Sequence, residues 1–345
     1  MPDATEIKRV DPYEDWLESE SINVIRGVFV EDVNDLELTP WPRTGGKGAY
    51  INFDACAGIL NSYVCEILPN SKLNPDRHLF EEIIFVLEGS GNTTIWDSTG
   101  KPQTFEWRKG SLFSIPINTS HQHSNLASVP AKFISFTNAP MIINLFRNLD
   151  FIFRNPFDFK ARFDGETDYW TKRMKGIIGK RTVWQTNLVN DLMASEVPDL
   201  EERGKTGRAY YIMGNSTLAP FLGVLPVGSY SKAHRHGPSA HIITLAGTGY
   251  TLLWKDGREY RFDWKPGSLV LPPDGMWHQI FNTGNTPERS LRVTLGGPAN
   301  YHAFGEMFWP VDNKKDQIEY MDEQPEIRAL FEKELSKNGI KSQMT

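Results

Sequence analysis

The sequence contains very little cysteine, no long apolar run and no basic stretch. Its two cysteines, Cys56 and Cys65, are too few for a disulfide framework and do not form a CxxC pair, so we expect both to be buried strand residues. No apolar stretch approaches the length of a membrane span, and the N-terminal residues lack the apolar segment of a secretory signal. These features predict a protein of the reducing cytoplasm that does not enter a membrane.

Charge and composition exclude two further classes of protein. The formal net charge is −6 with 23% of residues charged, and Lys and Arg do not cluster as binding to nucleic acid or to an anionic membrane would require. Hydrophobic residues make up 39% of the chain and aromatic residues 12%, which is more than a disordered chain carries. The 345 residues therefore predict large buried cores, in one large domain or in two to three smaller ones.

An internal repeat determines the organisation of the chain. The segment LEGSGNTTIWDSTGKPQTFEWRKGSLFSIPINTSHQHSN aligns with LAGTGYTLLWKDGREYRFDWKPGSLVLPPDGMWHQIFN further along. Two tryptophan pairs align, which chance explains poorly because tryptophan is rare. The repeat predicts two tandem copies of one domain, and its matched pairs are Gly89 and Gly247, Gly91 and Gly249, Trp96 and Trp254, Trp107 and Trp264, Gly110 and Gly267, Pro116 and Pro273, His121 and His278, and Asn125 and Asn282.

Each copy has the residue pattern of β-structure. Short apolar runs, IIFVL at 83–87 and HIITL at 241–245, are bounded by glycine pairs. Turn signals, DSTG at 97–100 and KDG at 255–257, separate the expected strands. Many short, closely spaced strands predict an all-β fold, a sandwich or a barrel of the jelly-roll kind.

We place the two β-domains at residues 46–140 and 201–311. Residues 1–45 then form an N-terminal arm, and residues 312–345 form a C-terminal helix and tail. Residues 141–200 connect the two domains and are too aromatic for a flexible linker, so we expect them to pack on the barrels.

Two helices are expected outside the repeats. Asp11 can cap a short helix that has Pro12 in its first position. A second helix begins near Pro325, and Gly339 is suited to end it. Its apolar residues recur at helical spacing and form one face, which consists of Ile327, Leu330, Phe331 and Leu335.

Three histidines of the second half have the spacing of a metal site. His234 and His236 are two residues apart, so on a strand both side chains point to the same face. His278 comes from a distant strand and can complete the set. Three imidazoles from two strands cover one side of a metal ion and leave positions open for substrate and oxygen.

The surrounding residues resemble the cupin superfamily, whose motifs are G-x5-H-x-H-x3,4-E-x6-G and G-x5-P-x-G-x2-H-x3-N. The second half departs from them at the glutamate, where Ala240 stands, and matches them at Gly228, His234, His236, Gly247, Gly267, Pro273, Gly275, His278 and Asn282. Three histidines without this glutamate are similar to the gentisate 1,2-dioxygenase group of bicupins. The resemblance covers roughly two-thirds of the chain.

This resemblance implies two jelly-roll barrels, an Fe(II) ion held by three histidines, and a homo-oligomer, for which a dimer is the expectation. One difference from that group concerns the place of the site. In the group the three-histidine site lies in the N-terminal barrel, whereas here it lies in the C-terminal one.

The first half offers a different set of ligands at the aligned positions. Asp76 and His78 align with His234 and His236, and Glu82 aligns with Ala240. The first barrel therefore offers two histidines and one carboxylate, His78, Glu82 and His121, with Asp76 as a candidate fourth ligand. Asn118 replaces the glycine of the second motif. His123 follows His121 by two residues and faces the same side, as a base or as a group that supports the ligands.

Most histidines in proteins do not bind metal, but five of the eight here fall on ligand positions of two aligned motifs. His241 is expected to face away from the ligands, as is Gln279, and His302 is assigned no role. The four repeated tryptophans are expected to pack rather than to contact substrate. Arg208 and Arg292 lie in expected strands and are candidates for binding a substrate carboxylate, with surface charges as the alternative.

The ligand charge favours one reaction. Three neutral imidazoles leave the full +2 charge on a divalent metal, which suits an anionic bidentate substrate, whereas a carboxylate ligand lowers the net charge to +1. With the resemblance, this predicts an Fe(II)-dependent ring-cleaving dioxygenase acting with O2 on a hydroxylated aromatic acid such as gentisate or salicylate.

Two alternatives remain open. In the first, Mn, Zn or Ni serves as a Lewis acid in a lyase, decarboxylase or isomerase, with Glu82 or His123 moving a proton. In the second, the protein binds a small molecule without catalysis.

Overall fold

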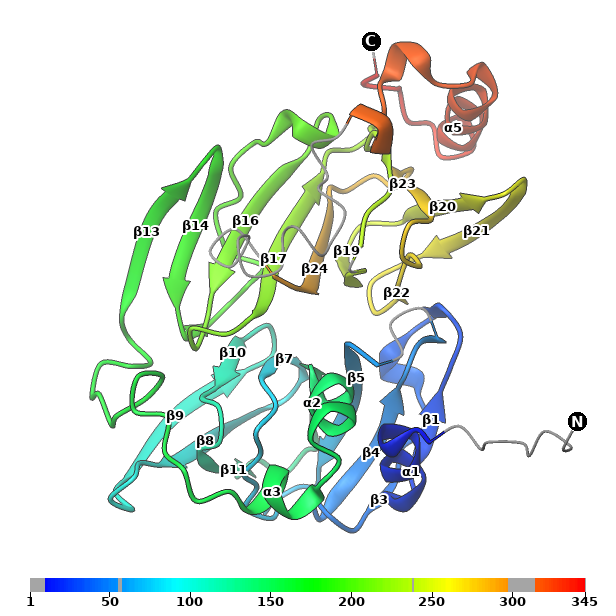
Figure 1. Ribbon diagram of the computed structural model, residues 1–345. Helices are drawn as coiled ribbons and strands as arrows, with labels where there is room; N and C mark the ends of the chain where they lie inside the picture. The colour runs from blue at the N-terminus through cyan, green and yellow to red at the C-terminus, as the bar shows by residue number, and fades with distance from the viewer. Residues whose placement is uncertain (1–9, 55–57, 238, 297–313, 345) are drawn as a thin grey trace, which may run out of the picture.

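The structure, a computed structural model, describes residues 10–54, 58–237, 239–296 and 314–344. Two β-barrels lie one above the other, with helices at their outer sides (Figure 1). Cys56 and His302 lie outside the described residues, whereas Cys65 is buried in a strand as expected. Within the described ranges, no helix is long and apolar enough to cross a bilayer.

Barrel 1 is built from two sheets. The first has the strand order β1 (Asn23–Ile25), β4 (Gly46–Ile51), β5 (Asn61–Ile67), β12 (Ala131–Thr137), β7 (Glu82–Glu88), β10 (Leu112–Ile115) and β15 (Leu188–Val189), with β3 (Thr39–Trp41) paired to β4. The second has the order β6 (Ser71–Lys72), β11 (Ser120–Asn125), β8 (Ser90–Trp96) and β9 (Pro102–Arg108).

Barrel 2 repeats this arrangement. Its first sheet has the order β13 (Arg173–Ile178), β14 (Arg181–Thr186), β16 (Gly207–Ile212), β17 (Leu218–Leu225), β24 (Glu288–Leu295), β19 (His241–Ala246), β22 (Leu269–Val270) and β2 (Phe29–Val30). Its second has the order β21 (Arg258–Trp264), β20 (Gly249–Lys255), β23 (Trp277–Asn282), β18 (Ala233–His234) and β25 (Gln317–Ile318). The run β5-β12-β7-β10 matches β17-β24-β19-β22, which confirms the all-β fold and the duplication.

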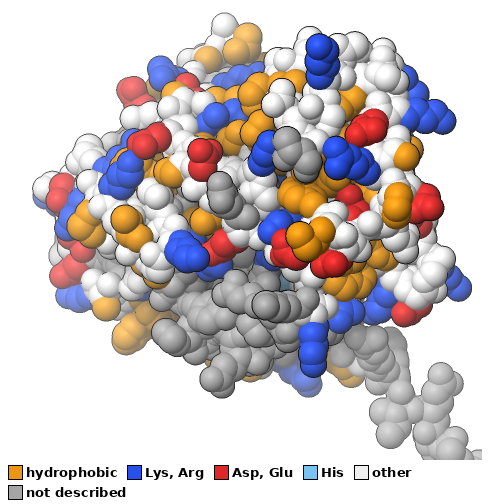
Figure 2. Space-filling view, turned by 90° about the horizontal axis from the view of Figure 1, so that it is seen from above, with side chains coloured by type: hydrophobic (Ala, Val, Ile, Leu, Met, Phe, Trp, Pro, Cys, Tyr) orange, Lys and Arg blue, Asp and Glu red, His pale blue; other side chains and the backbone are white. Residues whose placement is uncertain are grey.

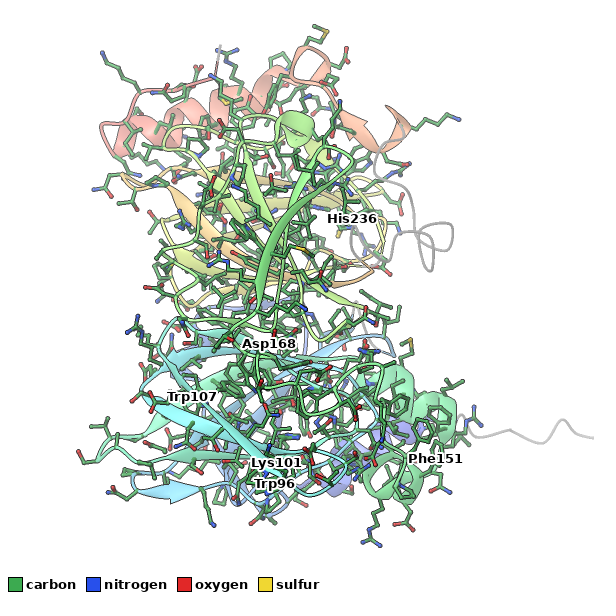
Figure 3. All side chains as sticks on the ribbon, turned by 90° about the vertical axis from the view of Figure 1, so that its left-hand side faces the viewer. Trp96, Lys101, Trp107, Phe151, Asp168 and His236 are labelled. Carbon is green, nitrogen blue, oxygen red and sulfur yellow. The ribbon has the colours of Figure 1, made fainter. Side chains whose placement is uncertain are left out.

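A glycine–tryptophan contact recurs at equivalent places in the two barrels. Gly91 pairs with Trp107 across β8 and β9, and Gly249 pairs with Trp264 across β20 and β21. A Cβ on either glycine would lie within 2.6 Å of the indole ring, so only glycine lets the ring lie flat on the strand. Both tryptophans are buried, as expected for packing residues. Figure 3 shows Trp107 in one barrel and His236 in the other.

The barrels exchange short strands. Strand β2 lies between strands of barrel 1 in the chain but pairs with β22 of barrel 2, and β15 lies between strands of barrel 2 but pairs with β10 of barrel 1. The large sheets share one hydrophobic core, which includes Ile83 from β7 and Ile243 from β19. Residues of the N-terminal arm therefore belong to both barrels.

The two helices that the sequence predicts, α1 and α5, are present, and two further helices were not predicted. Asp11 caps α1 (Pro12–Ser19) by accepting a hydrogen bond from the backbone of Glu14. Helix α5 (Pro325–Lys337) buries Phe331 and Leu335 against barrel 2, and Gly339 follows it with a positive φ of 67°. Helices α2 (Ala139–Phe146) and α3 (Leu149–Arg154) lie in the connector beside barrel 1 (Figure 1).

The described residues also include four 3-10 turns, at Val33–Asp35, Glu201–Arg203, Lys314–Asp316 and Tyr320–Asp322. Trp170 of the connector stacks on Phe105 of β9 with ring centroids 3.9 Å apart, which ties the connector to barrel 1. Seen from above, basic and acidic side chains are interspersed on the surface (Figure 2). A face of this kind does not present one sign of charge to a polyanion.

Candidate metal centres

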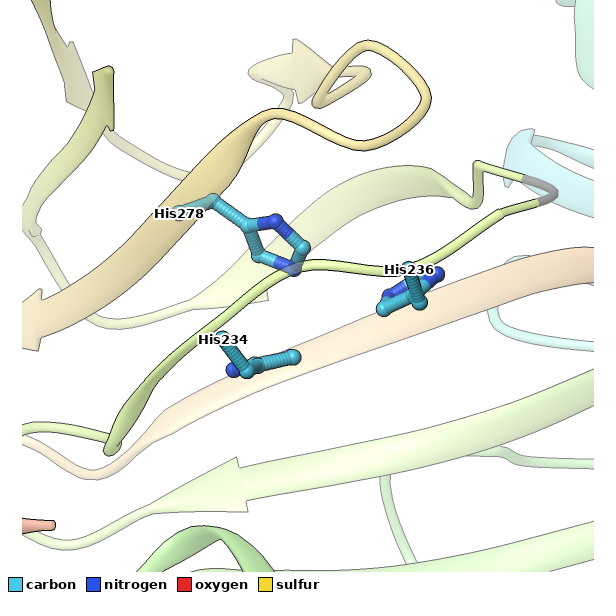
Figure 4. Close-up of side chains that lie close together, drawn as sticks. All are labelled: His234, His236 and His278. Atoms are coloured by element: carbon cyan, nitrogen blue, oxygen red, sulfur yellow. The ribbon is translucent and has the colours of Figure 1, made fainter. Parts of the chain in front are cut away.

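The first candidate centre consists of three histidines inside barrel 2 (Figure 4). His234 on β18 lies directly opposite His278 on β23, and His236 follows two residues later. Their ligand nitrogens all lie within 4.8 Å of one another. The ring centroids of His234 and His278 are 4.2 Å apart, and those of His236 and His278 are 5.0 Å apart. The structure therefore brings together the three histidines that the sequence predicts.

Hydrogen bonds fix the tautomers that metal binding requires. His234 Nδ1 donates to the Lys232 carbonyl at 2.9 Å, and His278 Nδ1 donates to the Met276 carbonyl at 3.1 Å. A carbonyl can only accept, so each Nδ1 carries the proton and each Nε2 keeps its lone pair. Burial, together with the neighbouring imidazoles, holds the pKa of both histidines well below its usual value. Both rings are therefore neutral at pH 7 and able to bind a cation.

Arginines surround this cluster. Arg292 on β24 is partly buried, with its side chain 12% exposed, and it pairs with Glu288 at 3.8 Å. Burial lowers its pKa to about 10, so it remains charged at pH 7. Arg208 on β16 lines the same small cavity as Arg292 and Ile280, and Ile280 lies on the His278 side of β23. Both arginines therefore point into barrel 2.

Arg203 is a third cation near the cluster, and the sequence did not indicate it. It is 5% exposed, and its charge contributes to the lowered pKa of His234 and of His278. Its guanidinium donates to the side chain of Gln317 on β25. Arg203 lies in a short turn with no motif around it, so no spacing in the sequence pointed to it.

The second candidate centre lies inside barrel 1. The ligand atoms of His78, Glu82 and His121 lie within 4.8 Å of one another, and all three residues are buried. His78 Nδ1 donates to the Phe80 carbonyl at 2.8 Å, and His121 Nδ1 donates to the Thr119 carbonyl at 3.0 Å. Each Nε2 therefore faces the cluster, where that of His121 keeps its lone pair and that of His78 is shared between a proton and a metal. His78 Nε2 lies 3.3 Å from Glu82 Oε2.

Glu82 is held as a carboxylate. The hydroxyls of Tyr63 and Ser135 both donate to its Oε1. Burial alone would raise the pKa of Glu82, but the hydrogen bond from His78 and the nearby imidazoles outweigh burial and hold it well below its usual value. Glu82 in turn raises the pKa of His78, against the effect of burial. The ligand set of barrel 1 thus contains an ionised carboxylate at neutral pH.

Asp76, the candidate fourth ligand, is paired with an arginine. Its Oδ2 accepts from Arg43 Nη1 at 2.5 Å, and the three ligands that converge in barrel 1 do not include it. Arg43 comes from the N-terminal arm, where it also contacts Glu20 at 2.7 Å and lies over the Trp41 ring. No pattern in the sequence indicated Arg43, because the contact joins segments far apart in the chain.

His123 is bonded to a side chain, unlike the ligand histidines, whose Nδ1 atoms meet backbone carbonyls. Thr93 Oγ1 accepts from Trp107 Nε1 at 2.9 Å and lies 2.7 Å from His123 Nδ1, so Thr93 links the two rings. Burial and the neighbouring His121 lower the pKa of His123 to about 3. His123 is therefore a neutral hydrogen-bond donor within barrel 1.

The structure also places the remaining residues of interest. His241 lies on the barrel 1 side of β19, where it stacks on Phe53 and contacts Phe136. Gln279 donates to Glu323 at 2.6 Å on the side of β23 opposite His278. Both face away from the ligands. Asn118, which replaces the motif glycine, has a φ of 54°, and Gly275 at the aligned position has 68°. Asparagine tolerates this left-handed conformation, which explains the exchange.

Comparison with known proteins agrees with this architecture. Residues 63–137, within barrel 1, match the model of the cupin domain family. Oxalate decarboxylase from Bacillus subtilis, in a deletion mutant, superposes with a TM-score of 0.52 at 18% identity, covering 79% of this chain and 78% of that one. A structure of the same enzyme from a study of its Mn(II) centres gives the same values. Residues 63–137 therefore resemble a cupin domain, and the two-barrel fold of the chain is that of a bicupin.

One curated relative of this bicupin is a gentisate 1,2-dioxygenase from a Ralstonia species. The two sequences are 28% identical over 152 residues, which is 40% of this chain and 40% of the dioxygenase. The aligned part thus spans well under half of that enzyme. The structural likeness to oxalate decarboxylase, at 18% identity, concerns the fold. Both of these similar proteins are enzymes. The name of the first is that of a dioxygenase, and the structure of the second comes from a study of its Mn(II) centres.

Proposed function

We propose that this bicupin is an Fe(II)-dependent ring-cleaving dioxygenase that acts on a hydroxylated aromatic acid in barrel 2. The observation that carries the proposal is the charge of the barrel 2 site. Three histidines converge there, and burial keeps His234 and His278 neutral. Ala240 stands where the cupin motif has glutamate, and Arg292 is partly buried nearby. A divalent metal would keep its full charge among these ligands, which suits a chelating anion.

The described residues have distinct roles in this proposal. His234, His236 and His278 would hold the metal by Nε2, with the tautomers of His234 and His278 set by the backbone. Iron bound there would supply the electron transfer between an electron-rich ring and O2. Arg292 would bind the substrate carboxylate and orient the ring, with Arg208 beside it, because a guanidinium matches a carboxylate with two parallel hydrogen bonds. Glu288 holds Arg292 in place.

The lyase or decarboxylase alternative is supported by the carboxylate of barrel 1 and by the fold likeness to oxalate decarboxylase. Such a reaction needs a group that exchanges a proton near neutral pH. Glu82 stays ionised under three hydrogen bonds, and His123 stays neutral with Nδ1 already bonded to Thr93. Barrel 1 therefore suits stable metal binding better than proton transfer, which favours the dioxygenase.

The test combines metal analysis with oxygen uptake. Protein purified without added metal is analysed for metal identity and number per chain, then loaded with Fe(II) and assayed with gentisate, salicylate and 1-hydroxy-2-naphthoate. We expect one or two irons per chain and oxygen consumption coupled to loss of the aromatic absorbance. Mn with oxygen-independent turnover would instead favour the lyase, and no metal after reconstitution would leave a binding protein.

A further inference from the structure

Two adjacent glutamates lie at the start of β7, Glu82 as its first residue and Glu81 directly before it, and they point in opposite directions. Successive side chains on a strand alternate between its faces. Glu82 points into barrel 1, where it joins the ligand cluster with His78 and His121. Glu81 points the other way, is 5% exposed, and meets residues of the connector and of barrel 2. One peptide unit thus joins a candidate metal ligand to a buried carboxylate that faces the second barrel.

Three segments hold the Glu81 carboxylate. Arg162 of the connector donates to Oε1 at 2.6 Å. Thr217, between β16 and β17 of barrel 2, donates to Oε2 through its backbone N–H at 2.9 Å and also through its hydroxyl. Asn138 donates to Oε2 at 3.2 Å and accepts from the Glu81 backbone N–H at 2.8 Å. Arg162 also donates to the carbonyl of Gly214 at 2.8 Å, so the same barrel 2 loop is bound twice.

The second repeat shows whether a buried carboxylate like that of Glu81 also occurs beside a position without a carboxylate ligand. Ser239 and Ala240 of barrel 2 align with Glu81 and Glu82. Ser239 bonds within its own barrel, to the Pro272 carbonyl and to Asp274 at 2.6 Å. The copy without a carboxylate ligand therefore also lacks the carboxylate anchor. Within this chain, the anchor occurs only together with the ligand that it adjoins.

We propose that Glu81 is a positioning residue for the barrel 1 metal, through which the connector and barrel 2 set the place of Glu82. The inference rests on the proposed metal binding by barrel 1. Glu82 shares its backbone with Glu81, so a shift of the anchor moves the start of β7 and with it the ligand carboxylate. Loss of a residue that supports a metal ligand commonly weakens metal binding by about 10–100-fold.

The test measures the Co(II) affinity of each barrel separately. The His278→Ala background removes a proposed ligand of barrel 2 and reports barrel 1, whereas the Glu82→Ala background reports barrel 2. Glu81→Gln and Arg162→Met are made in each background, and Co(II) is titrated by visible absorption. We expect about 10-fold weaker binding in barrel 1 and no change in barrel 2. Thr217→Val, which removes one donor only, serves if a stronger variant unfolds.

Glu66→Gln is the matched control, because Glu66 is a barrel 1 glutamate whose ion pair with Lys47 at 3.6 Å lies apart from the cluster. The proposal is overturned if Glu66→Gln weakens barrel 1 as much as Glu81→Gln does, or if Glu81→Gln and Thr217→Val leave its affinity unchanged. A failure of the underlying metal proposal is recognised separately. In that case the His278→Ala protein binds no Co(II) even with Glu81 intact, which also removes the role proposed for Glu81.

Discussion

Barrel 1 and barrel 2 share their strand order, yet their two candidate metal centres differ in charge. Barrel 1 has Glu82 where barrel 2 has Ala240, and barrel 2 has His234 where barrel 1 has Asp76. Barrel 1 thus offers a carboxylate ligand beside a second carboxylate already paired with Arg43. Barrel 2 offers three histidines and no carboxylate, with the buried Arg203 and the partly buried Arg292 near them. The pair shows that one scaffold can set the charge of a bound metal through single positions.

The side chains that surround the two clusters also differ, and those of barrel 1 are the more polar. In barrel 1, Thr93 links Trp107 to His123. In barrel 2 the aligned threonine, Thr251, has no hydrogen-bond partner for its hydroxyl among the described residues, and the position of His123 is taken by Ile280. Barrel 1 therefore places a polar donor where barrel 2 has an apolar wall. An apolar wall beside a cationic site suits the ring and the carboxylate of an aromatic acid.

The largest expected effect separates the barrels by activity. His278→Ala removes one of three ligands from the proposed reaction site, so we expect oxygen uptake to fall by at least about 1000-fold. Glu82→Ala removes a ligand from barrel 1 only, and we expect a fall of less than about 10-fold. Oxygen electrode assays on both Fe(II)-loaded variants test this. The reverse order of effects would move the reaction to barrel 1.

Arg292 tests how barrel 2 recognises its substrate. Arg292→Met removes a partly buried cation, and we expect kcat/KM for a carboxylate substrate to fall by about 100-fold, mainly through KM, because a charge-assisted hydrogen bond is lost. Arg289→Met is the control, since Arg289 lies on the opposite face of β24 and donates to the Ser195 carbonyl. Equal losses in the two variants would contradict a role in substrate binding.

The two centres should release metal at different pH values. Glu82 raises the pKa of His78, so a proton competes for the Nε2 of His78 as the pH falls through that raised value. The pKa of His234 and of His278 lies well below the usual value, so barrel 2 meets this competition only in stronger acid. We expect barrel 1 to lose about 10-fold in affinity per pH unit in that range. Co(II) titrations of the single-site variants at pH 7.0 and 5.5 would measure it, and parallel losses would argue against the difference.

The smallest expected effect is a change in the stability of the folded protein on substitution of His241. It aligns with Ile83 in the core between the barrels, and neither of its ring nitrogens has a hydrogen-bond partner among the described residues. His241→Ile should therefore stabilise the protein by about 1 kcal/mol at pH 7. Burial lowers the pKa of His241 to about 3, so below pH 6.5 the unfolded state binds the proton more readily and native stability falls.

The gain from His241→Ile should consequently increase between pH 7 and pH 5. Urea unfolding at both values measures it, and Ile83→His is the converse variant, which should destabilise the protein. A constant difference between His241→Ile and the unchanged protein across this range would mean that the imidazole is not buried in its neutral form.

The sequence was sufficient for the fold and for the grouping of the ligand residues, because both depend on spacing along the chain. Strand alternation placed His234 beside His236, and the repeat brought His278 and His121 to matching positions. Arg43 and Arg203 could not be foreseen, since each reaches its site from a segment without a counterpart in the repeat. The sequence also could not predict which way some side chains point. Arg292 is an example, because its partial burial depends on strands far apart in the chain.

The exchanged strands have a consequence for how the chain is made. Strand β2 cannot pair until β22, about 240 residues later in the sequence, has been synthesised. During synthesis on a ribosome, a short piece of the N-terminal arm stays unpaired until most of the second barrel has emerged. Removing one barrel would therefore leave the other without one of its edge strands.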